Sequence, residues 1–567
     1  MKILLVGINA KYIHTCLSVR YLRQCCPDAV MREYTINDRP AQVTASIFEE
    51  QPDVALFSCY IWNINFVLEV ADNLKKVLPE CRIFFGGPEV SYDAKRVLDE
   101  NPFVDGILRG EGEKTFSSLV QSQMNPHGIL GMSYRKGGEI VSNPDRELIC
   151  DLNTIPFPYT EEEMKPLSGK LIYYESSRGC PFQCSYCISS TIHSVRYLPL
   201  WRVKQELLFF IRHNVRIVKF VDRTFNADRK RTYELFEFLI ANAGETTFHF
   251  EIAADLFNEE ILSLLKTAPK GLFQFEIGVQ STNPSTIAAI DRKTSVAKIK
   301  NAVMSLLDIG TVHLHLDLIA GLPYEDLRTF RRSFDEVFSL HPHVLQLGFL
   351  KLLRGTKIRT QTDLFHYQYL SQPPYEILSN DFLSYGDVLV LKRVEDVFEQ
   401  YYNSGVFSHA MEYLLKRWDS AFDLFLEVAD FFKEHGYDKV AHSRKNLYAL
   451  LCEFAKEKDM PDAFYDYLKY DYLMQNKGAA TPEWSLAPYD KALLSFRFDF
   501  LKEEENIHRY LPEHEGQKVK DIIKQVHFER FFYDVLGGGK KEEHVILFDY
   551  FHEKAVKISS NKHDKFF

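Results

Sequence analysis

The stretch RGCPFQCSYC, residues 178–187, decides how the middle of this chain folds and what it holds. It places Cys180, Cys184 and Cys187 in a C-x3-C-x2-C spacing directly after a predicted strand. Three thiolates on one loop can ligate three irons of a cubane cluster, which leaves the fourth iron open to a substrate or cofactor. Structural zinc prefers four ligands, commonly from paired CxxC units, and the sequence has no second such pair. The spacing therefore favours an iron–sulfur cluster over zinc and over loop cysteines without a metal.

Strands and helical patterns alternate downstream of this loop. The candidate strands are residues 171–176, 217–222, 248–253, 273–279, 313–320 and 344–350. This many βα units between residues 171 and 355 predict an open or partial α/β barrel, whose site lies at the C-terminal rim of the strands.

Upstream of the loop, short apolar runs end in small or glycine residues and alternate with helical patterns. The runs are residues 2–7, 53–59, 81–87 and 104–113, and the helical patterns are residues 17–24 and 68–78. Residues 1–125 are therefore predicted to form a Rossmann-like, doubly wound parallel sheet, with ligands at the carboxyl ends of its strands.

The segments between and after these two domains differ in character. In residues 126–170, RKGGE is a hairpin turn signal and the prolines of IPFPY keep the chain extended, which predicts a hairpin and a linker strap. Residues 356–567 are rich in aromatic and charged residues with helical periodicity, which predicts a mainly helical domain that ends in a β-ribbon. The aromatic side chains of this domain either cap the barrel over a substrate or fill a helical core.

Composition restricts the classes of function. A chain of 567 residues is long enough for three or four domains. The net charge of -10 argues against a protein that mainly binds nucleic-acid phosphates, although a local basic groove remains open. Ten scattered cysteines do not form a disulfide scaffold. The N-terminus lacks a secretory apolar region and no run spans a bilayer, so we expect a reducing cytoplasm.

The cluster loop resembles that of the radical S-adenosylmethionine (SAM) superfamily. The resemblance implies that the three cysteines hold a [4Fe-4S] cluster whose open iron chelates the amino and carboxylate groups of SAM. It also implies that one electron cleaves SAM to methionine and a 5′-deoxyadenosyl radical, and that Tyr186 packs near the adenine. The partial barrel that the family adopts agrees with the strand pattern.

Polar residues at other strand ends of the barrel are candidates for binding SAM. They are Asp222, Asn226, Glu251, Gln280, Ser281 and Arg292. Polar groups inside apolar strands need a partner when they are buried, and SAM offers an ammonium, a carboxylate and ribose hydroxyls. The alternative is an internal network, for instance an ion pair between Glu251 and Arg292. The superfamily resemblance supports contacts of these two residues with the ribose and the carboxylate.

The order of the domains, with RGEGE at residues 109–113 before the strap and the cluster loop, resembles the cobalamin-binding subgroup of radical SAM proteins. The resemblance implies cofactor contacts from Tyr12, His14, Ser58, Trp62, Gly86, Gly87, Glu89, Gly110, Glu111 and Glu113. The glycines among them let the backbone approach a flat ligand closely. The DxHxxG signature that places a histidine on cobalt is absent. We therefore expect cobalamin without a histidine ligand and His14 as a hydrogen-bonding residue of its loop; loss of the cofactor is the alternative.

The resemblance favours a methyltransferase that acts on an unreactive carbon. It implies two SAM molecules per turnover: one methylates cobalamin, and the other gives the radical that abstracts a substrate hydrogen. A rearrangement or reduction with the same cofactors stays open. So does an RNA-modifying enzyme, since VQST at residues 279–282 resembles tRNA methylthiotransferases, and so does a non-catalytic cobalamin or redox sensor. An electron donor such as flavodoxin or ferredoxin is the expected partner, and residues 356–567 resemble an uncharacterised domain found in some members.

Overall fold

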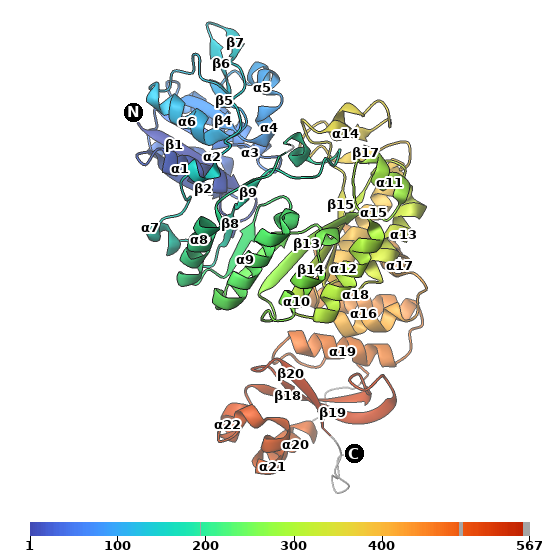
Figure 1. Cartoon of the computed structure of the whole chain (residues 1–567). Coiled ribbons are helices and arrows are strands. Elements are labelled where there is room, and N and C mark those ends of the chain that lie inside the picture. The colour runs from blue at the N-terminus through green and yellow to red at the C-terminus, as the bar shows by residue number, and fades with distance from the viewer. Residues whose placement is uncertain (193, 487–491, 559–567) are drawn as a thin grey trace. The chain divides into compact units, whose positions relative to one another are not determined.

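The protein divides into two compact units, Met1–Val388 and Leu389–Phe567. Figure 1 shows the computed structural model, which describes residues 1–192, 194–486 and 492–558. The first unit contains two sheets, named here sheet A and sheet B, and the second contains helices and one smaller sheet.

Sheet A contains five parallel strands followed by an antiparallel hairpin, in the order β2-β1-β3-β4-β5-β6-β7. Its strands are β1 (Ile3–Asn9), β2 (Val30–Thr35), β3 (Val54–Ser58), β4 (Arg82–Gly86), β5 (Gly106–Leu108), β6 (Met132–Lys136) and β7 (Glu139–Ser142). The predicted parallel sheet is confirmed. The predicted hairpin extends this sheet, because β6 pairs antiparallel with β5 and covers its edge. β2 was missed because VMREYT is an edge strand that is mostly only half-buried.

Helices cover both faces of sheet A. Its helices are α1 (Leu17–Cys25), α2 (Pro40–Glu49), α3 (Ile64–Val77), α4 (Pro88–Ser91), α5 (Ala94–Glu100) and α6 (Gly112–Gln121). Apolar side chains of α2 to α5 share one core with the sheet, and those of α1 and α6 share a second core on the opposite face. This doubly wound packing leaves the loops at the carboxyl ends of the parallel strands free for a ligand.

Sheet B contains six parallel strands in the order β15-β14-β13-β12-β11-β8. They are β8 (Leu171–Tyr174), β11 (Ile217–Phe220), β12 (Thr247–Glu251), β13 (Phe273–Gln280), β14 (Val312–Ala320) and β15 (Val344–Phe349). Each of the six strands predicted for the barrel is present. The helices that follow them include α8 (Leu200–Arg212), α9 (Arg229–Asn242), α10 (Glu259–Leu265), α12 (Val296–Ile309) and α13 (Leu327–Phe338). Figure 1 shows these helices along one face of the strands.

Burial alternates strictly along the strands of sheet B. In β14, every second residue from Val312 to Ala320 is fully buried, and the residues between them are less buried. Helices cover the first set, so His313, His315 and Asp317 lie on the opposite face, which we call the inner face of sheet B. This face carries the polar residues of the barrel.

The second unit is mainly helical, as the sequence predicts, and ends in a three-stranded antiparallel sheet. Its elements include α16 (Ser408–Leu415), α17 (Ala421–Glu434), α18 (Arg444–Glu457), α19 (Ala463–Gln475), α20 (Ala492–Lys502), α21 (Glu504–Tyr510), η7 (Pro512–His514), α22 (Val519–Ile522), β18 (Val526–Tyr533), β19 (Lys541–Asp549) and β20 (Lys554–Ile558). The predicted β-ribbon is the pair β19 and β20, and β18 joins it.

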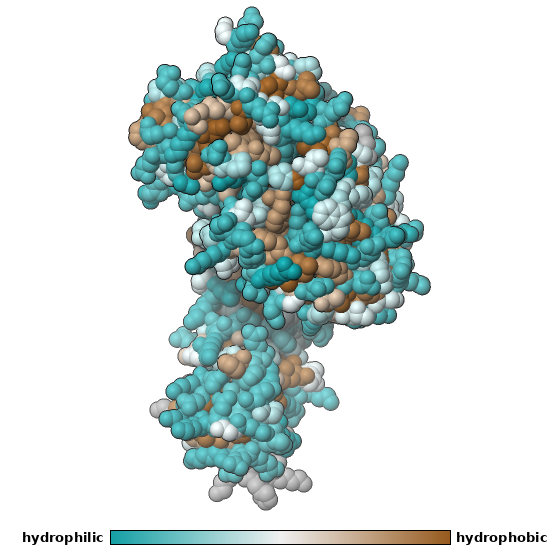
Figure 2. Space-filling view, turned by 60° about the vertical axis from the view of Figure 1, so that its left-hand side comes forward, coloured by the Kyte–Doolittle hydropathy of each residue, from teal (hydrophilic) through white to brown (hydrophobic). Residues whose placement is uncertain are grey.

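The surface is polar over most of the face seen in Figure 2, where apolar residues gather in separate patches. Among the described residues, no helix combines the length and the apolar character needed to cross a bilayer.

Candidate active site

The cysteine loop is closed by a short pair of strands. β9 (Ser177–Arg178) runs antiparallel to β10 (Arg196–Tyr197), so the loop leaves and returns at one point. Gly179 has φ 102°, and a Cβ there would lie 2.0 Å from the backbone oxygen of Ser194. Only glycine tolerates both this conformation and this contact, so Gly179 allows the loop to close directly before the first cysteine.

All three cysteines of the loop are free thiols. Cys180 and Cys184 are buried, Cys187 is half-buried, and the backbone N–H of Cys187 donates to the oxygen of Cys184 over 3.1 Å. Their three sulfur atoms do not all lie within 4.8 Å of one another. Three thiolates on one loop can each ligate a separate iron of a cluster.

Arg292 connects the cysteine loop with sheet B. Its Nη1 lies 3.7 Å from the Cys184 sulfur and 3.2 Å from the Tyr186 hydroxyl, and its Nη2 donates to the Gly278 oxygen. Burial raises the pKa of Cys184, and the Arg292 guanidinium acts against that increase. The alternative of an ion pair between Glu251 and Arg292 is wrong, since Arg292 makes these contacts instead.

The inner face of sheet B brings charged residues of neighbouring strands side by side. Glu276 lies next to Glu251 on one side and next to His315 on the other. Its Oε2 accepts from His249 and from Lys219, each over 2.9 Å. The hydrogen bond from His249 is the main cause that lowers the pKa of Glu276 to about 2. This carboxylate is therefore ionised and already paired.

Two other carboxyl groups of the inner face lack such partners. Burial raises the pKa of Glu251 to about 7, although the Arg223 guanidinium favours its ionised form. Burial also raises the pKa of Asp317 to about 8, and the neighbouring carboxylates Glu276 and Glu251 raise it further. Asp317 Oδ1 is buried without a hydrogen-bond partner among the described residues. A cationic ligand would compensate for the cost of burying these carboxyl groups in their ionised form.

Some of the residues predicted to bind SAM already have hydrogen-bond partners within the protein, and others have polar atoms that are available to a ligand. Asp222 accepts from the backbone and hydroxyl of Ser176 and from the Ser177 hydroxyl, so it holds the strand that leads into the cysteine loop. Asn226 exchanges two hydrogen bonds with the backbone of Ala253, and the Ser281 hydroxyl donates to Glu325.

Gln280 and Arg292 each keep one polar atom available, in Arg292 beside the contacts that its two Nη atoms make. Gln280 has φ 71° at the end of β13, where the pairing with β14 shifts register. Within the described part of the chain, Gln280 Oε1 and Arg292 Nε are buried and have no hydrogen-bond partner. Orphaned polar atoms at the carboxyl end of sheet B fit the amino, carboxylate and hydroxyl groups of SAM.

Lys219, His249, His315 and Asp317 were missed as candidate site residues. The signal for His249, His315 and Asp317 is present in the sequence, because FHFE, FQFEI and HLHLDL alternate apolar and polar residues with period two. A strand buried on both faces would be apolar at almost every position, so this alternation indicates a second, polar face.

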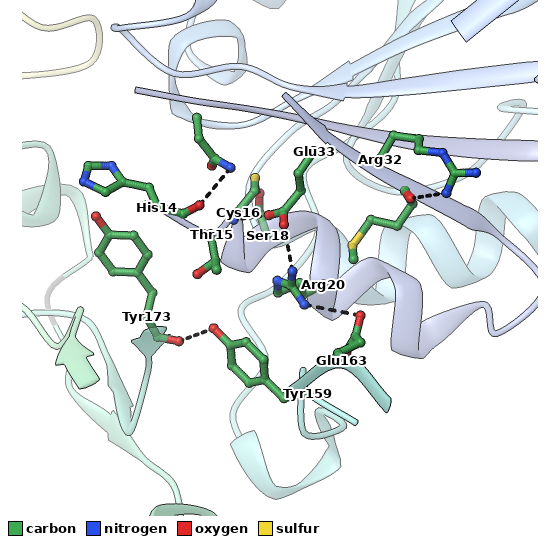
Figure 3. A network of polar contacts seen from close by, with 12 residues as sticks. His14, Thr15, Cys16, Ser18, Arg20, Arg32, Glu33, Tyr159, Glu163 and Tyr173 are labelled. Carbon is green, nitrogen blue, oxygen red and sulfur yellow. Dashed lines mark hydrogen bonds and ion pairs between the residues drawn. The ribbon is translucent and has the colours of Figure 1, made fainter. Parts of the chain in front are cut away.

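The loop after β1 lies against the first strand of sheet B. The Ile13 oxygen accepts from the Leu171 backbone N–H over 2.7 Å, and the Thr15 hydroxyl donates to the Leu171 oxygen over 3.3 Å. The backbone oxygen of His14 accepts a hydrogen bond from the side-chain amide of Asn9. The imidazole ring of His14 packs edge-on against the Tyr173 ring (Figure 3). These contacts bring a predicted cobalamin loop directly to the barrel.

A buried ion-pair network supports this junction. Arg20 on α1 pairs with Glu33 over 2.7 Å and with Glu163 over 3.2 Å (Figure 3). Its guanidinium lies 5.3 Å from the centre of the Tyr159 ring, whose hydroxyl donates to the Tyr173 oxygen. The network joins α1, β2 and the segment before β8, so it fixes the N-terminal sheet to the barrel.

Exposed aromatic rings and glycines mark the predicted cobalamin edge of sheet A. Tyr12 is 76% exposed, and Trp62 is 48% exposed and stacks on Tyr60 at 4.3 Å. Gly87 has φ 115°, and a Cβ there would lie 2.4 Å from the Cys59 oxygen. Flat, accessible rings beside closely approaching loops suit a large planar ligand.

Ser58, Gly86 and Gly110 complete the small residues predicted at this edge. The Ser58 hydroxyl is buried 3.2 Å from the Cys16 sulfur. Gly86 is the last residue of β4, and Gly110, with φ 73°, has open space where a Cβ would project. Gly110 therefore leaves room for a ligand, whereas Ser58 already has a protein neighbour.

The three acidic residues predicted at this edge have arginine partners. Glu89 pairs with Arg354 over 3.0 Å. Glu111 pairs with Arg196 over 2.8 Å, and Glu113 pairs with Arg178 over 2.5 Å. These carboxylates therefore link sheet A to the barrel, and their role in cofactor binding stays a prediction.

Comparison with known proteins assigns these domains. Residues 3–120 match the B12 binding domain family, residues 174–337 match the radical SAM superfamily, and residues 363–548 match DUF4080, a family of unknown function. The cobalamin-dependent radical SAM methyltransferase TokK of Streptomyces tokunonensis is 28% identical over 323 residues, 53% of this chain and 47% of that protein. A 2-(S-pantetheinyl)-carbapenam-3-carboxylate methyltransferase of Streptantibioticus cattleyicolor is 25% identical over 66% of this chain and 60% of that protein.

Solved structures show the same fold. The cobalamin-dependent SAM radical enzyme OxsB, with aqua-cobalamin and SAM bound, superposes with a TM-score of 0.58 at 15% identity, covering 83% of this chain and 79% of that chain. The methyltransferase TsrM from Kitasatospora setae gives a TM-score of 0.54 at 14% identity, covering 66% and 79% of the two chains. The chain spans about half to two thirds of the length of the curated relatives it matches. The chain therefore contains, in this order, a region that matches the B12 binding domain family, a region that matches the radical SAM superfamily and a region that matches the DUF4080 family.

Proposed function

We propose that this chain is a cobalamin-dependent radical SAM enzyme that methylates an unactivated carbon. The observation that carries the proposal is the direct junction of the B12 binding domain with the barrel. Glu111 and Glu113, which follow β5, are ion-paired with Arg178, two residues before Cys180, in the same unit that holds the three-cysteine loop. A shared site requires such a junction, because methyl donor, radical source and substrate must meet within reacting distance.

When bound, the cluster, SAM and cobalamin would supply reductive SAM cleavage and a methyl carrier. The residues of the chain hold these groups in position. Cys180, Cys184 and Cys187 ligate iron, and Arg292 orients Cys184 and Tyr186 through its two Nη1 contacts. The unpaired carboxyl oxygen of Asp317 offers an acceptor to the N–H groups of the SAM amino group. An external one-electron donor such as a flavodoxin or ferredoxin completes the proposal.

The relatives support methyl transfer over the other chemistries. TokK and the carbapenam-carboxylate enzyme are named methyltransferases, and a hopanoid C-3 methylase of Methylococcus capsulatus is 26% identical over 48% of this chain and 53% of that protein. Anaerobic magnesium-protoporphyrin IX monomethyl ester cyclases also match, with 23% identity over 59% of this chain for that of Cereibacter sphaeroides. The experiment therefore has to separate methylation from other radical chemistry.

The test supplies the reconstituted protein with SAM, cobalamin, a reductant and fractionated cell extract. Mass spectrometry then follows which compound gains one methyl group. A methyltransferase releases S-adenosylhomocysteine and 5′-deoxyadenosine in comparable amounts, since one reports methyl donation and the other hydrogen abstraction. 5′-Deoxyadenosine with only background S-adenosylhomocysteine would refute methyl transfer and leave a rearrangement or reduction.

A further inference from the structure

Three metal-ligating side chains converge in the second unit, outside the sites described above. They are His514 at the end of η7, Asp549 at the end of β19, and His552 in the turn before β20. One ligand atom from each lies within 4.8 Å of the others, and within the described parts of the chain this is the one such group. His514 Nε2 lies 3.0 Å from Asp549 Oδ2, and His552 Nδ1 lies 2.7 Å from the same oxygen.

The group is buried on one side and open on the other. The side chains of His514 and Asp549 are 0% and 1% exposed, while that of His552 is 26% exposed. Histidine nitrogens and carboxylate oxygens are ligands that zinc takes in proteins, and the exposed side leaves room for a fourth ligand. Ligand atoms around tetrahedral zinc lie about 3.3 Å apart for bonds of about 2.0 Å, so only small side-chain rotations are needed.

A hydrogen bond outside the group orients the His514 ring. His514 Nδ1 lies 3.2 Å from Gln517 Oε1. Donation from Nδ1 to that amide oxygen would leave the lone pair of Nε2 for a metal ion. Nε2 lies on the side of the ring that faces Asp549 Oδ2. Metal-bound histidines are commonly oriented by just this kind of contact from their other ring nitrogen.

The carboxylate is oriented in the same way. Asp549 Oδ1 accepts from the backbone N–H groups of Phe551 and His552 over 3.1 and 3.3 Å. This leaves Oδ2 directed at the two rings. The nearby ammonium of Lys554 is bonded to both carboxylate oxygens of Glu513, so it is not the partner of Asp549.

We propose that His514, Asp549 and His552 bind one zinc ion and that this ion fixes the closing sheet of the second unit. The ion would join η7 to the turn between β19 and β20, which are far apart in sequence. The site is independent of the cluster and of cobalamin. Its proposed role is structural, because it connects two backbone segments and because binding energy of a structural metal adds to folding stability.

The test measures zinc in the full-length chain after its cysteine cluster is reconstituted with iron, so that the thiolates are occupied. We expect about one zinc per chain after dialysis, bound through imidazole and oxygen at about 2.0–2.1 Å in zinc X-ray absorption, without sulfur at about 2.3 Å. Zinc content should fall to background in His552→Gln and His514→Gln, with iron content unchanged. His508→Gln is the matched control, since His508 is an exposed histidine of the same unit, and it should retain zinc.

Three results would overturn the proposal: no zinc in the wild-type chain, zinc retained by His552→Gln, or zinc bound through sulfur. The first would assign the group to hydrogen bonds between the two histidines and Asp549 alone. If His514→Gln does not fold, His552→Gln still decides, because His552 is partly exposed. In addition, zinc should raise the melting temperature of the wild-type chain and of His508→Gln but not that of His552→Gln.

Discussion

Replacing Arg178 with methionine removes the cation that three carboxylates share between sheet A and the cysteine loop. Arg178 lies 2.5 Å from Glu113, 2.8 Å from Glu175 and 3.6 Å from Glu111. Glu111 keeps Arg196, so two carboxylates lose their cation. Arg178 and Glu113 are 12% and 9% exposed, and breaking such a buried pair costs about 3–5 kcal/mol.

Scanning calorimetry measures this change as a lower transition temperature of the first unit. With an unfolding entropy of about 2.1 cal/mol/K per residue, the cost lowers the midpoint of a unit of this size by about 4–6 °C. Arg178→Lys should recover part of the loss. Arg96→Met is the matched control, since Arg96 is half-exposed and pairs only at 3.8–4.0 Å, and it should cost under about 1 kcal/mol.

The pH dependence of the Arg178→Met deficit tests its cause. Burial raises the pKa of Glu175, and Arg178 opposes that increase, so removing Arg178 raises this pKa further. A raised folded-state pKa costs stability at high pH, and the cost disappears as the pH falls and the group binds a proton. The deficit should therefore shrink between pH 8 and pH 5.5. An unchanged midpoint, or a deficit that is the same at both pH values, would refute the electrostatic explanation.

Three further predictions concern the cofactor sites. Changing the three loop cysteines, Cys180, Cys184 and Cys187, to alanine should abolish the binding of about four irons and the visible cluster absorbance, and a triple variant that keeps its iron would place the cluster elsewhere. SAM affinity should rise as the pH increases through about 8, the raised pKa of Asp317, because its carboxylate then attracts the sulfonium cation of SAM, whose charge does not titrate; equilibrium dialysis should show no such rise in Asp317→Asn, and an equal rise there would exclude this role. Gly87→Ala should cost about 1–3 kcal/mol and lower cobalamin binding, since a Cβ would collide with the Cys59 oxygen; unchanged thermal stability and cobalamin retention would contradict the tight approach of these loops.

The order of elements could be read from the sequence because local patterns encode it. The apolar runs of sheet A and the alternating strands of sheet B are each specified by their own side chains. The three cysteines lie within one loop of eight residues, Cys180 to Cys187, so their common role needs no tertiary information. The same holds for the hairpin turn at RKGGE.

Only the tertiary structure decided which polar side chains are available. Asp222, Asn226 and Ser281 follow strands just as Gln280 does, but the first three are engaged by nearby backbone and side-chain groups, whereas Gln280 Oε1 is not. Likewise, Glu111 and Glu113 find arginines that lie 65 or more residues away in sequence. The type of a residue and its position on a strand limit what it can bind. Its partners, however, depend on how distant segments of the chain fold against each other. This packing therefore decides which charged and polar groups remain unpaired.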